Sequence, residues 1–573
     1  MQQRRKSFKT NRSFDADQLF QNRQMQNVEI RRQLRDEIIS KHRNLSSYKE
    51  KSFSNEPKLI VRNLKIENLS EIAQGIFSNH VEKQLISMRK FRKLLAEERV
   101  PPIQQIIDTG VVPKFVEFLQ SNNQLLKIES SWALTNILAG NIEHIKVVID
   151  SGALPIFVQL LQNENSNEVK EHAIWAIGNI SSDEMFCEMV FCSGALKSLL
   201  NVLNQIDENS SLIPTLARTL CNLCRVKVSE EEWYWLSVAL SRMIYSNDDD
   251  VLYSTCWALS YLFDCELDCN QRKQSIINTR ICPRLVELMI HKNFNVQFPA
   301  LKCVKNISAG SHDQTQVILH CEALRILKDL LVSTRHSIRK EACLIVSTIA
   351  KRAVNQIHAI VDAGIIPLLI NLIRNSDFKT KKEAIWAICN TIRYSYSQPN
   401  SFRQIINSGC IQPMIDMLDC KDTEITLTIL EVIQIILKFG EFAKTPNNRD
   451  NEYSLFIEEI GGKEKIYDLQ YHKNYEIYHL AYDIIDKYFG DYEEGSEESD
   501  HFTFKHNNND DNNDINNSII NSPFTGFQFL KQPIPFDGFH FNESDSSKQN
   551  GETSQPSNGI YRFSVTPNQF VGF

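Results

Sequence analysis

A repeated unit constrains the fold of this chain of 573 residues more than any other feature. A Trp-Ala-Leu-Thr-Asn stretch begins at Trp132, and related stretches begin at Trp175, Trp257 and Trp386, separated by one or more steps of about 42 residues. A Gly-x-x-Pro pattern, seen first at Gly110, has the same period. Glycine commonly ends one helix and proline opens the next. A period of this length is typical of armadillo or HEAT arrays, in which each unit packs only against its neighbours.

Each repeated stretch combines an apolar face with an aromatic–amide pair. At about 100° per residue on a helix, Leu134 and Ile137 lie on the apolar face, and Trp132 and Asn136 lie together on the opposite side. Core packing of the indole and helix capping or solvation of the amide are the alternative interpretations. Because the pair recurs, we instead predict a surface that binds something along its length.

The period and composition together predict the architecture. We expect an all-α, right-handed superhelical solenoid of about ten repeats, each containing a short helix and two longer ones. Residues 1–50 are expected to form a basic segment that becomes helical over 28–44, residues 51–78 a linker, and residues 79–490 the array. Residues 491–573 form an acidic, Asn-rich tail that we expect to be disordered.

Charge and hydropathy exclude several classes of function. The 63 Lys and Arg against 70 Asp and Glu give a net charge of −7, which does not support direct nucleic-acid binding. Neither a secretory signal nor an apolar stretch long enough to span a membrane is present, so we expect no membrane partner. The charge is instead unevenly distributed, with a basic N-terminal segment and an acidic run at 491–500, as in interaction tails.

The 14 cysteines have no disulfide-scaffold spacing and are expected to be reduced and intracellular. Cys221 and Cys224 are followed one repeat later by Cys265 and Cys269, and thiolates at such spacing could suit tetrahedral zinc. Buried cysteines in repeat helices more commonly act as small hydrophobic residues. Since no nucleophile or phosphate-binding motif stands out either, we predict no metal, no cofactor and no enzymatic activity.

Residues 4 to 495 resemble the importin-α family of nuclear import adaptors. The resemblance rests on Asp108-Thr-Gly-Val-Val-Pro, Cys221-Asn-Leu-Cys-Arg, Glu476-Ile-Tyr and Tyr488-Phe-Gly in their proper order, and Val28-Glu-Ile-Arg-Arg-Gln-Leu-Arg is similar to the importin-β-binding helix. It implies a concave groove for lysine-rich and arginine-rich nuclear localisation signals of cargo proteins. It also implies an importin-β-binding segment that includes Arg4, Phe8, Lys9, Arg31, Arg32, Arg35, Lys41 and Arg43.

The resemblance also implies two cargo sites, in which asparagines hold the peptide backbone and indoles contact Lys or Arg stems. Each cation–π contact contributes ~0.5 to 2 kcal/mol. The major site would comprise Trp132, Asn136, Gly140, Trp175, Asn179, Asp183, Asn222 and Trp257. The minor site would comprise Tyr261, Asp264, Asn306, Thr315, Glu341, Glu383, Trp386 and Asn390. Asp183 is expected to pair with the most deeply bound lysine. We expect Trp175→Ala or Asn179→Ala to weaken the binding of a lysine-rich peptide while leaving the thermal unfolding transition nearly unchanged.

This chain departs from the family pattern at several of these positions. Arg218 and Leu344 stand where the family has tryptophan, and Ile145 stands where it has a hydroxyl. Ser254 replaces an acid, Lys302 replaces an arginine, and Thr348 replaces an asparagine. We therefore expect the major site to accept a shorter basic run and the minor site to be weak. The self-inhibitory basic run reads Lys41-His42-Arg43, and a histidine that is mostly neutral at cytosolic pH predicts weak autoinhibition.

Further partners follow from the same resemblance. The C-terminal repeat and acidic run would bind the export receptor that recycles the adaptor, and Gly-Phe pairs in the tail resemble those of nuclear pore components. Shuttling between cytoplasm and nucleus would follow. The competing hypothesis is an armadillo scaffold in adhesion or signalling, whose groove would be lined by Lys and Arg for acidic partners.

Overall fold

The computed structural model describes residues 69–97, 101–207, 209–264, 270–351, 353–444 and 450–490. Within these ranges the chain consists of helices joined by turns and contains no strand, so the predicted all-α class is confirmed. The described residues belong to one compact unit, residues 1–492. The predicted importin-β-binding segment and the tail lie outside the described residues.

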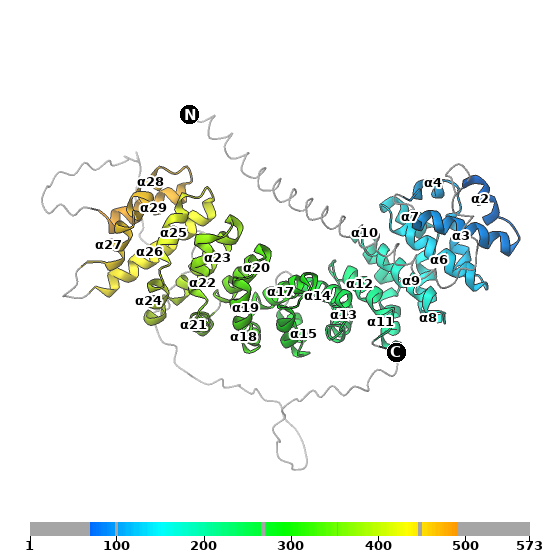
Figure 1. Cartoon of the computed structure of the whole chain (residues 1–573), viewed down its shortest axis with the longest axis horizontal. Helices are drawn as coiled ribbons and strands as arrows, with labels where there is room; N and C mark the ends of the chain where they lie inside the picture. Colours follow the sequence, from blue (N-terminus) through cyan, green and yellow to red (C-terminus); the bar gives the residue numbers. More distant parts are fainter. Residues whose placement is uncertain are drawn as a thin grey trace, which may run out of the picture. The chain divides into compact units, whose positions relative to one another are not determined.

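The last helix of each repeat belongs to a row that runs through the array, and each member packs against its neighbours in the row (Figure 1). We call them the ladder helices. They are α3 (Val81–Glu97), α6 (Gln124–Leu138), α9 (Asn167–Ile180), α12 (Ile213–Leu223), α14 (Asp249–Phe263), α17 (Phe294–Ser308), α20 (His336–Ile349), α23 (Phe378–Ser395), α26 (Thr423–Ala443) and α29 (Tyr475–Tyr488).

Shorter helices complete each repeat. The helix directly before each ladder helix packs against it; these are α2 (Leu69–Ile76), α5 (Val112–Phe118), α8 (Ala153–Asn163), α11 (Ala195–Gln205), α13 (Glu230–Met243), α16 (Cys282–Leu288), α19 (Ala323–Leu331), α22 (Ile366–Asn375), α25 (Ile411–Asp416) with η4 (Met417–Asp419), and α28 (Gly462–Asp468) with η5 (Leu469–Tyr471). The first helices are α4 (Ile103–Asp108), α7 (Ile142–Asp150), α10 (Glu184–Cys192), α15 (Asn270–Asn278), α18 (His312–His320), α21 (Val354–Asp362), α24 (Pro399–Asn407) and α27 (Glu452–Glu459).

The prediction of a short helix and two longer ones holds in some repeats and fails in others. It holds for α7, α8 and α9, which have 9, 11 and 14 residues, and it is wrong for α15, α16 and α17, which have 9, 7 and 15. Helix α2 also begins inside the segment 51–78 that we expected to be a linker, and its Ile72 and Ile76 are buried.

The turn between the first and second helices uses the predicted glycine. Gly152 has φ +82° at the start of α8, a left-handed conformation that residues with a Cβ adopt only at a cost. Proline then occupies the first turn of α5 and of α22, as predicted. Two repeats lack the glycine, and Arg280 and Glu322 take the same conformation there, at φ +65° and +62°.

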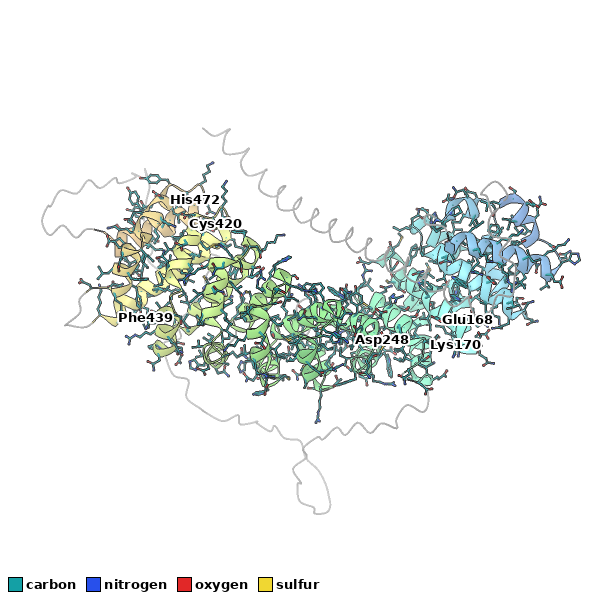
Figure 2. All side chains as sticks on the ribbon, in the orientation of Figure 1. Glu168, Lys170, Asp248, Cys420, Phe439 and His472 are labelled. Carbon is teal, nitrogen blue, oxygen red and sulfur yellow. The ribbon has the colours of Figure 1, made fainter. Side chains whose placement is uncertain are left out.

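The ladder helices begin at polar caps and bury the predicted apolar face. Helices α6, α9 and α14 are capped by Asn123, Ser166 and Asp248, whose side chains accept hydrogen bonds from backbone N–H groups of the first turn. Asp248 is labelled in Figure 2. Leu134 and Ile137 are completely buried in the cluster that runs through the array.

No single helix among the described residues is long and apolar enough to cross a membrane. Three bent pairs, α7 with α8, α10 with α11 and α21 with α22, meet the criteria of length and composition together.

Candidate functional site

The ladder helices bring the repeated aromatic and amide positions into one continuous row. We call this row the ladder surface. In chain order it consists of Trp132, Asn136, Trp175, Asn179, Arg218, Asn222, Trp257, Tyr261, Lys302, Asn306, Leu344, Thr348, Trp386 and Asn390, two residues from each ladder helix from α6 to α23.

The indoles of the ladder surface lie beside the hydrophobic core and do not belong to it. Trp132, Trp257 and Trp386 are half-buried, and Trp175 is 9% exposed. None of the four is a member of the continuous core cluster, whereas Trp233 of α13 is. Trp132, Trp257 and Trp386 therefore lie outside the hydrophobic core with part of their surface exposed to solvent. Little of Trp175 remains accessible.

The asparagines clamp neighbouring repeats together, which sequence reasoning missed. The Nδ2 group of Asn179 donates to the Thr135 carbonyl of α6 at 3.0 Å. The same cross-repeat bond joins Asn222 to Gly178 O (2.8 Å), Asn306 to Ser260 O (3.0 Å), and Asn390 to Ser347 O (3.3 Å) and Ser347 Oγ (2.9 Å). A side-chain amide has a second N–H and an acceptor oxygen, so the half-buried amides of Asn179 and Asn222 are held in one orientation with hydrogen-bonding capacity left for a peptide backbone. Asn306 and Asn390 are 6% and 1% exposed and offer little such surface.

Asn136 is the exception in this row. Its side chain is 1% exposed, and neither Nδ2 nor Oδ1 has a hydrogen-bond partner in the described part of the chain. A buried amide without partners costs free energy. Because both atoms are buried, Asn136 offers no surface to a peptide backbone in this structure, unlike the half-buried Asn179 and Asn222.

The clamp changes what an asparagine substitution should do. Asn179→Ala removes the bond to Thr135 O, so we expect it to lower the free energy of unfolding by about 1 kcal/mol as well as weakening a lysine-rich peptide. Because of this bond, we expect a lower thermal transition for Asn179→Ala and not an unchanged one. Thermal unfolding should be compared with Asn375→Ala, which removes only an exposed bond to Asn371 within α22. Equal transition temperatures for the two variants would contradict the clamp.

Asp183 has a structural function in addition to the predicted one. It is the N-cap of α10, and its Oδ1 accepts from the Met185 N–H at 3.0 Å. The side chain is half-buried, and its second oxygen makes no hydrogen bond or ion pair within the described ranges. A lysine could therefore pair with this carboxylate without breaking the cap.

Of three other positions at the major site, Gly140 is half-buried, whereas Ile145 and Ser254 are buried. Gly140 follows α6, and its N–H donates to Ile137 O at 3.0 Å. Ile145 belongs to the core with 1% exposure, and Ser254 is 5% exposed. The replacement of a hydroxyl by Ile145 therefore removes a polar group at a place where the chain is already packed.

A buried arginine fixes the start of the ladder surface, and it too was missed. The Arg92 guanidinium lies 4.3 Å from the centre of the Trp132 ring, and Arg92 Nε is 2.8 Å from Glu129 Oε2. Arg89 Nε is 3.3 Å from the other oxygen of Glu129. The His172 ring stacks on Trp132 at 5.4 Å with an interplanar angle of 21°. The only sequence signal was Glu129 one turn before Trp132, with no indication of which cation it meets.

Aromatic rings gather at the middle of the ladder surface. Trp257 stacks on Tyr261 at 5.9 Å and lies 6.3 Å from Phe298 of α17. Tyr261 is half-buried, whereas Asp264, just past α14, is exposed. Lys302 Nζ lies 5.2 Å from the Phe298 ring, so a cation of the chain itself already contacts this cluster.

In the predicted minor site, cations of the chain itself contact the acids and the indole. Lys302 Nζ is 2.7 Å from Glu341 Oε2, and Glu341 is 3% exposed. Lys340 Nζ is 3.9 Å from Glu383 Oε1. Burial raises the pKa of Glu383, and Lys340 opposes that shift. Lys351 Nζ lies 5.9 Å from the centre of the Trp386 ring.

Two threonines in the predicted minor-site region make only intramolecular contacts that the structure describes: Thr315 is buried, and Thr348 bonds to its own helix. Thr315 is fully buried, and its hydroxyl donates within the turn between α17 and α18, to Ser308 O or Ser311 O at 3.0 Å. It has no surface for a cargo side chain here, contrary to its predicted place in the site. The Thr348 hydroxyl donates to Leu344 O at 2.8 Å, so α20 lacks the amide clamp to α17.

Most of the described cysteines are buried, whereas Cys192 is exposed and Cys221 is half-buried. Burial raises the pKa of Cys221 to about 12 and that of Cys224 well above its usual value, which disfavours thiolates. In the described ranges no three His, Cys, Asp or Glu side chains are grouped as metal ligands. Cys265 and Cys269 lie outside those ranges.

Family comparisons fit this architecture. The importin beta binding domain matches residues 4–89, the Armadillo/beta-catenin-like repeat matches 99–139, 141–182 and 354–392, and the atypical Arm repeat matches 451–502. An engineered protein of known crystal structure, 23% identical, superposes with a TM-score of 0.64 over 74% of this chain and 99% of its own, which supports the fold alone. The chain is thus an armadillo-repeat protein with an importin-β-binding domain.

Curated relatives narrow the class. Importin subunit alpha-1a of Oryza sativa subsp. japonica is 41% identical over 486 residues, covering 84% of this chain and 91% of the relative. Importin subunit alpha-4 of Arabidopsis thaliana is 38% identical, covering 86% and 92%, and importin subunit alpha-3 of Arabidopsis thaliana is 36% identical, covering 92% and 96%. This chain belongs to the importin-α family, and its broad role is that of a nuclear import adaptor.

Proposed function

We propose that this chain binds lysine-rich and arginine-rich nuclear localisation signals of cargo proteins along the ladder surface. The observation that supports this best is the row of part-open indoles and clamped amides on successive ladder helices. Indole faces attract the ammonium and guanidinium groups of a bound peptide, and clamped amides can pair with its backbone at regular intervals. Asp183 would neutralise one lysine.

Cargo binding is expected to be strongest on α6, α9, α12 and α14. In the half formed by α17, α20 and α23, the carboxylates of Glu341 and Glu383 already face Lys302 and Lys340, and Lys351 contacts Trp386. A cargo cation there must displace a cation of the chain itself. Signals with two basic runs should therefore gain little over signals with one.

The N-terminal segment would link the loaded adaptor to importin-β. The match of residues 4–89 to the importin beta binding domain supports this, as do the basic residues that include Arg31, Arg32 and Arg35. An export receptor at the C-terminal repeat, nucleoporin contacts of the tail, and shuttling between cytoplasm and nucleus complete the proposal.

Photo-crosslinking tests where the peptide binds. A lysine-rich peptide with a photoreactive group at its centre should crosslink to α6, α9 and α14, since their indoles lie outside the core, and a peptide with alanine in place of lysine should not. Crosslinks mainly on second helices would contradict the proposal. In a parallel pull-down, changing Arg31, Arg32 and Arg35 together to Glu should abolish capture by importin-β while peptide binding persists.

A further inference from the structure

Arg218 interrupts the row of indoles in the strongest half of the ladder surface. It occupies on α12 the position that Trp132, Trp175 and Trp257 occupy on α6, α9 and α14. The order along the surface is therefore indole, indole, guanidinium, indole. A cargo cation would be attracted at Trp175 and Trp257, would meet Arg92 already in contact with Trp132, and would be repelled at Arg218.

Two polar side chains that follow Arg218 in the sequence are tied to the preceding repeat. Asn222 Nδ2 donates to Gly178 O at 2.8 Å, and Arg225 Nη1 donates to Ser182 O at 3.2 Å. Asn222 lies one turn after Arg218 on the same face of α12, and Arg225 lies in the turn just past the end of that helix. The Arg218 guanidinium makes no hydrogen bond and no ion pair within 4 Å to any residue that the structure describes.

The surroundings of Arg218 supply little compensation for its charge. The side chain is half-buried, and burial lowers its pKa, against which Asp250 and Tyr253 act from α14. Asp250 is exposed in the first turn of α14 and is further away than an ion pair allows. A guanidinium stays charged in proteins and offers five N–H donors, so this site has unused capacity for an anion.

We propose that Arg218 is a specificity-determining residue that binds an anionic side chain of the cargo peptide, a carboxylate or a phosphate. A guanidinium pairs with either group through two parallel N–H···O bonds. This chain would then prefer signals in which one acidic or phosphorylated residue interrupts the basic run, because the lysines on either side still meet Trp175 and Trp257. The inference rests on the proposed binding of basic peptides to the ladder surface.

The experiment is a position scan of a short all-lysine peptide against the full chain, measured by calorimetry. At each position lysine is replaced in turn by alanine, glutamate and phosphoserine. At one position glutamate or phosphoserine should bind about tenfold more tightly than alanine. The glutamate and phosphoserine arms distinguish a carboxylate from a phosphate ligand.

Variants of the chain then assign the preference to Arg218. Arg218→Ala should abolish it, and Arg218→Trp should make lysine the best residue at that position. Asp250→Asn, which removes the nearby carboxylate, should strengthen the preference for the anionic residue. Arg374→Ala on α22, an exposed arginine on a second helix, is the matched control and should change nothing.

The outcomes separate this inference from the proposed function. If the all-lysine peptide binds but alanine equals or exceeds both anionic residues at every position, the role of Arg218 is wrong and the proposed function stands. A preference that survives in Arg218→Ala also overturns it. If no basic peptide binds, the proposed function itself fails.

Discussion

Replacing Asp183 with lysine is expected to lower the affinity for a lysine-rich peptide by about a hundredfold, which corresponds to about 2.7 kcal/mol of binding free energy. The substitution removes an attractive carboxylate and places a like charge beside the bound ammonium. It also removes the cap of α10, in which Asp183 accepts from the Met185 N–H, so stability should fall by about 1 kcal/mol. Calorimetric titration and thermal unfolding measure the two effects separately.

Two controls distinguish the charge from the cap. Asp183→Asn keeps a good N-cap and removes only the charge, so the thermal transition should hold while affinity falls about tenfold. Asp377→Lys makes the same change of charge and also removes an N-cap, but at α23, far along the array. There Asp377 accepts a hydrogen bond from the Thr380 N–H. If Asp377→Lys weakened the peptide as much as Asp183→Lys, the effect would come from net charge and Asp183 would have no specific role.

Glu129→Ala is expected to lower the free energy of unfolding at the N-terminal end of the array by about 3 kcal/mol. Arg92 is 5% exposed, and the substitution removes the carboxylate 2.8 Å from its guanidinium. It also removes the 3.3 Å contact to Arg89. Urea unfolding, together with hydrogen exchange of α3 and α6, reports the loss where it occurs.

A surface ion pair provides the comparison for this variant. Lys114 and Glu117 lie 2.6 Å apart on α5, and the Glu117 side chain is 65% exposed. Exposed pairs contribute ~0–1 kcal/mol, so Glu117→Ala should have little effect. If Glu117→Ala and Glu129→Ala lowered the free energy of unfolding by similar amounts, the burial of Arg92 would not increase the contribution of its carboxylate partner to stability.

Local pattern was enough to predict the repeats but not the lengths of their helices. The Gly152 turn and the apolar face with Leu134 and Ile137 follow from backbone conformation and helix geometry, which depend on residues a few positions apart. The lengths of the second helices do not follow in this way, since α13 has 14 residues and α16 only 7. Each second helix packs against the ladder helix that follows it, and this packing is not a local pattern.

The predicted site shows the same division. Periodicity identified the Trp and Asn positions because each pair is local to one helix. The bond from Asn179 to Thr135 O, the contact of Arg92 with Trp132, and the pairing of Lys302 with Glu341 each join different repeats. Their partners are separated by roughly one period, and spacing alone cannot say which side chains meet.

The sequence by itself determined that this protein is a helical repeat array with an aromatic–amide row and a basic N-terminal segment, because those features are written in local periodicity and composition. Only the tertiary structure decided which members of that row are open to a ligand. Thr315 is buried, Glu341 is paired, the Asn222 amide is clamped, and Arg218 is without an ion-pair partner among the described residues. Burial and pairing depend on the neighbouring repeat, and so they appear only when the repeats are stacked.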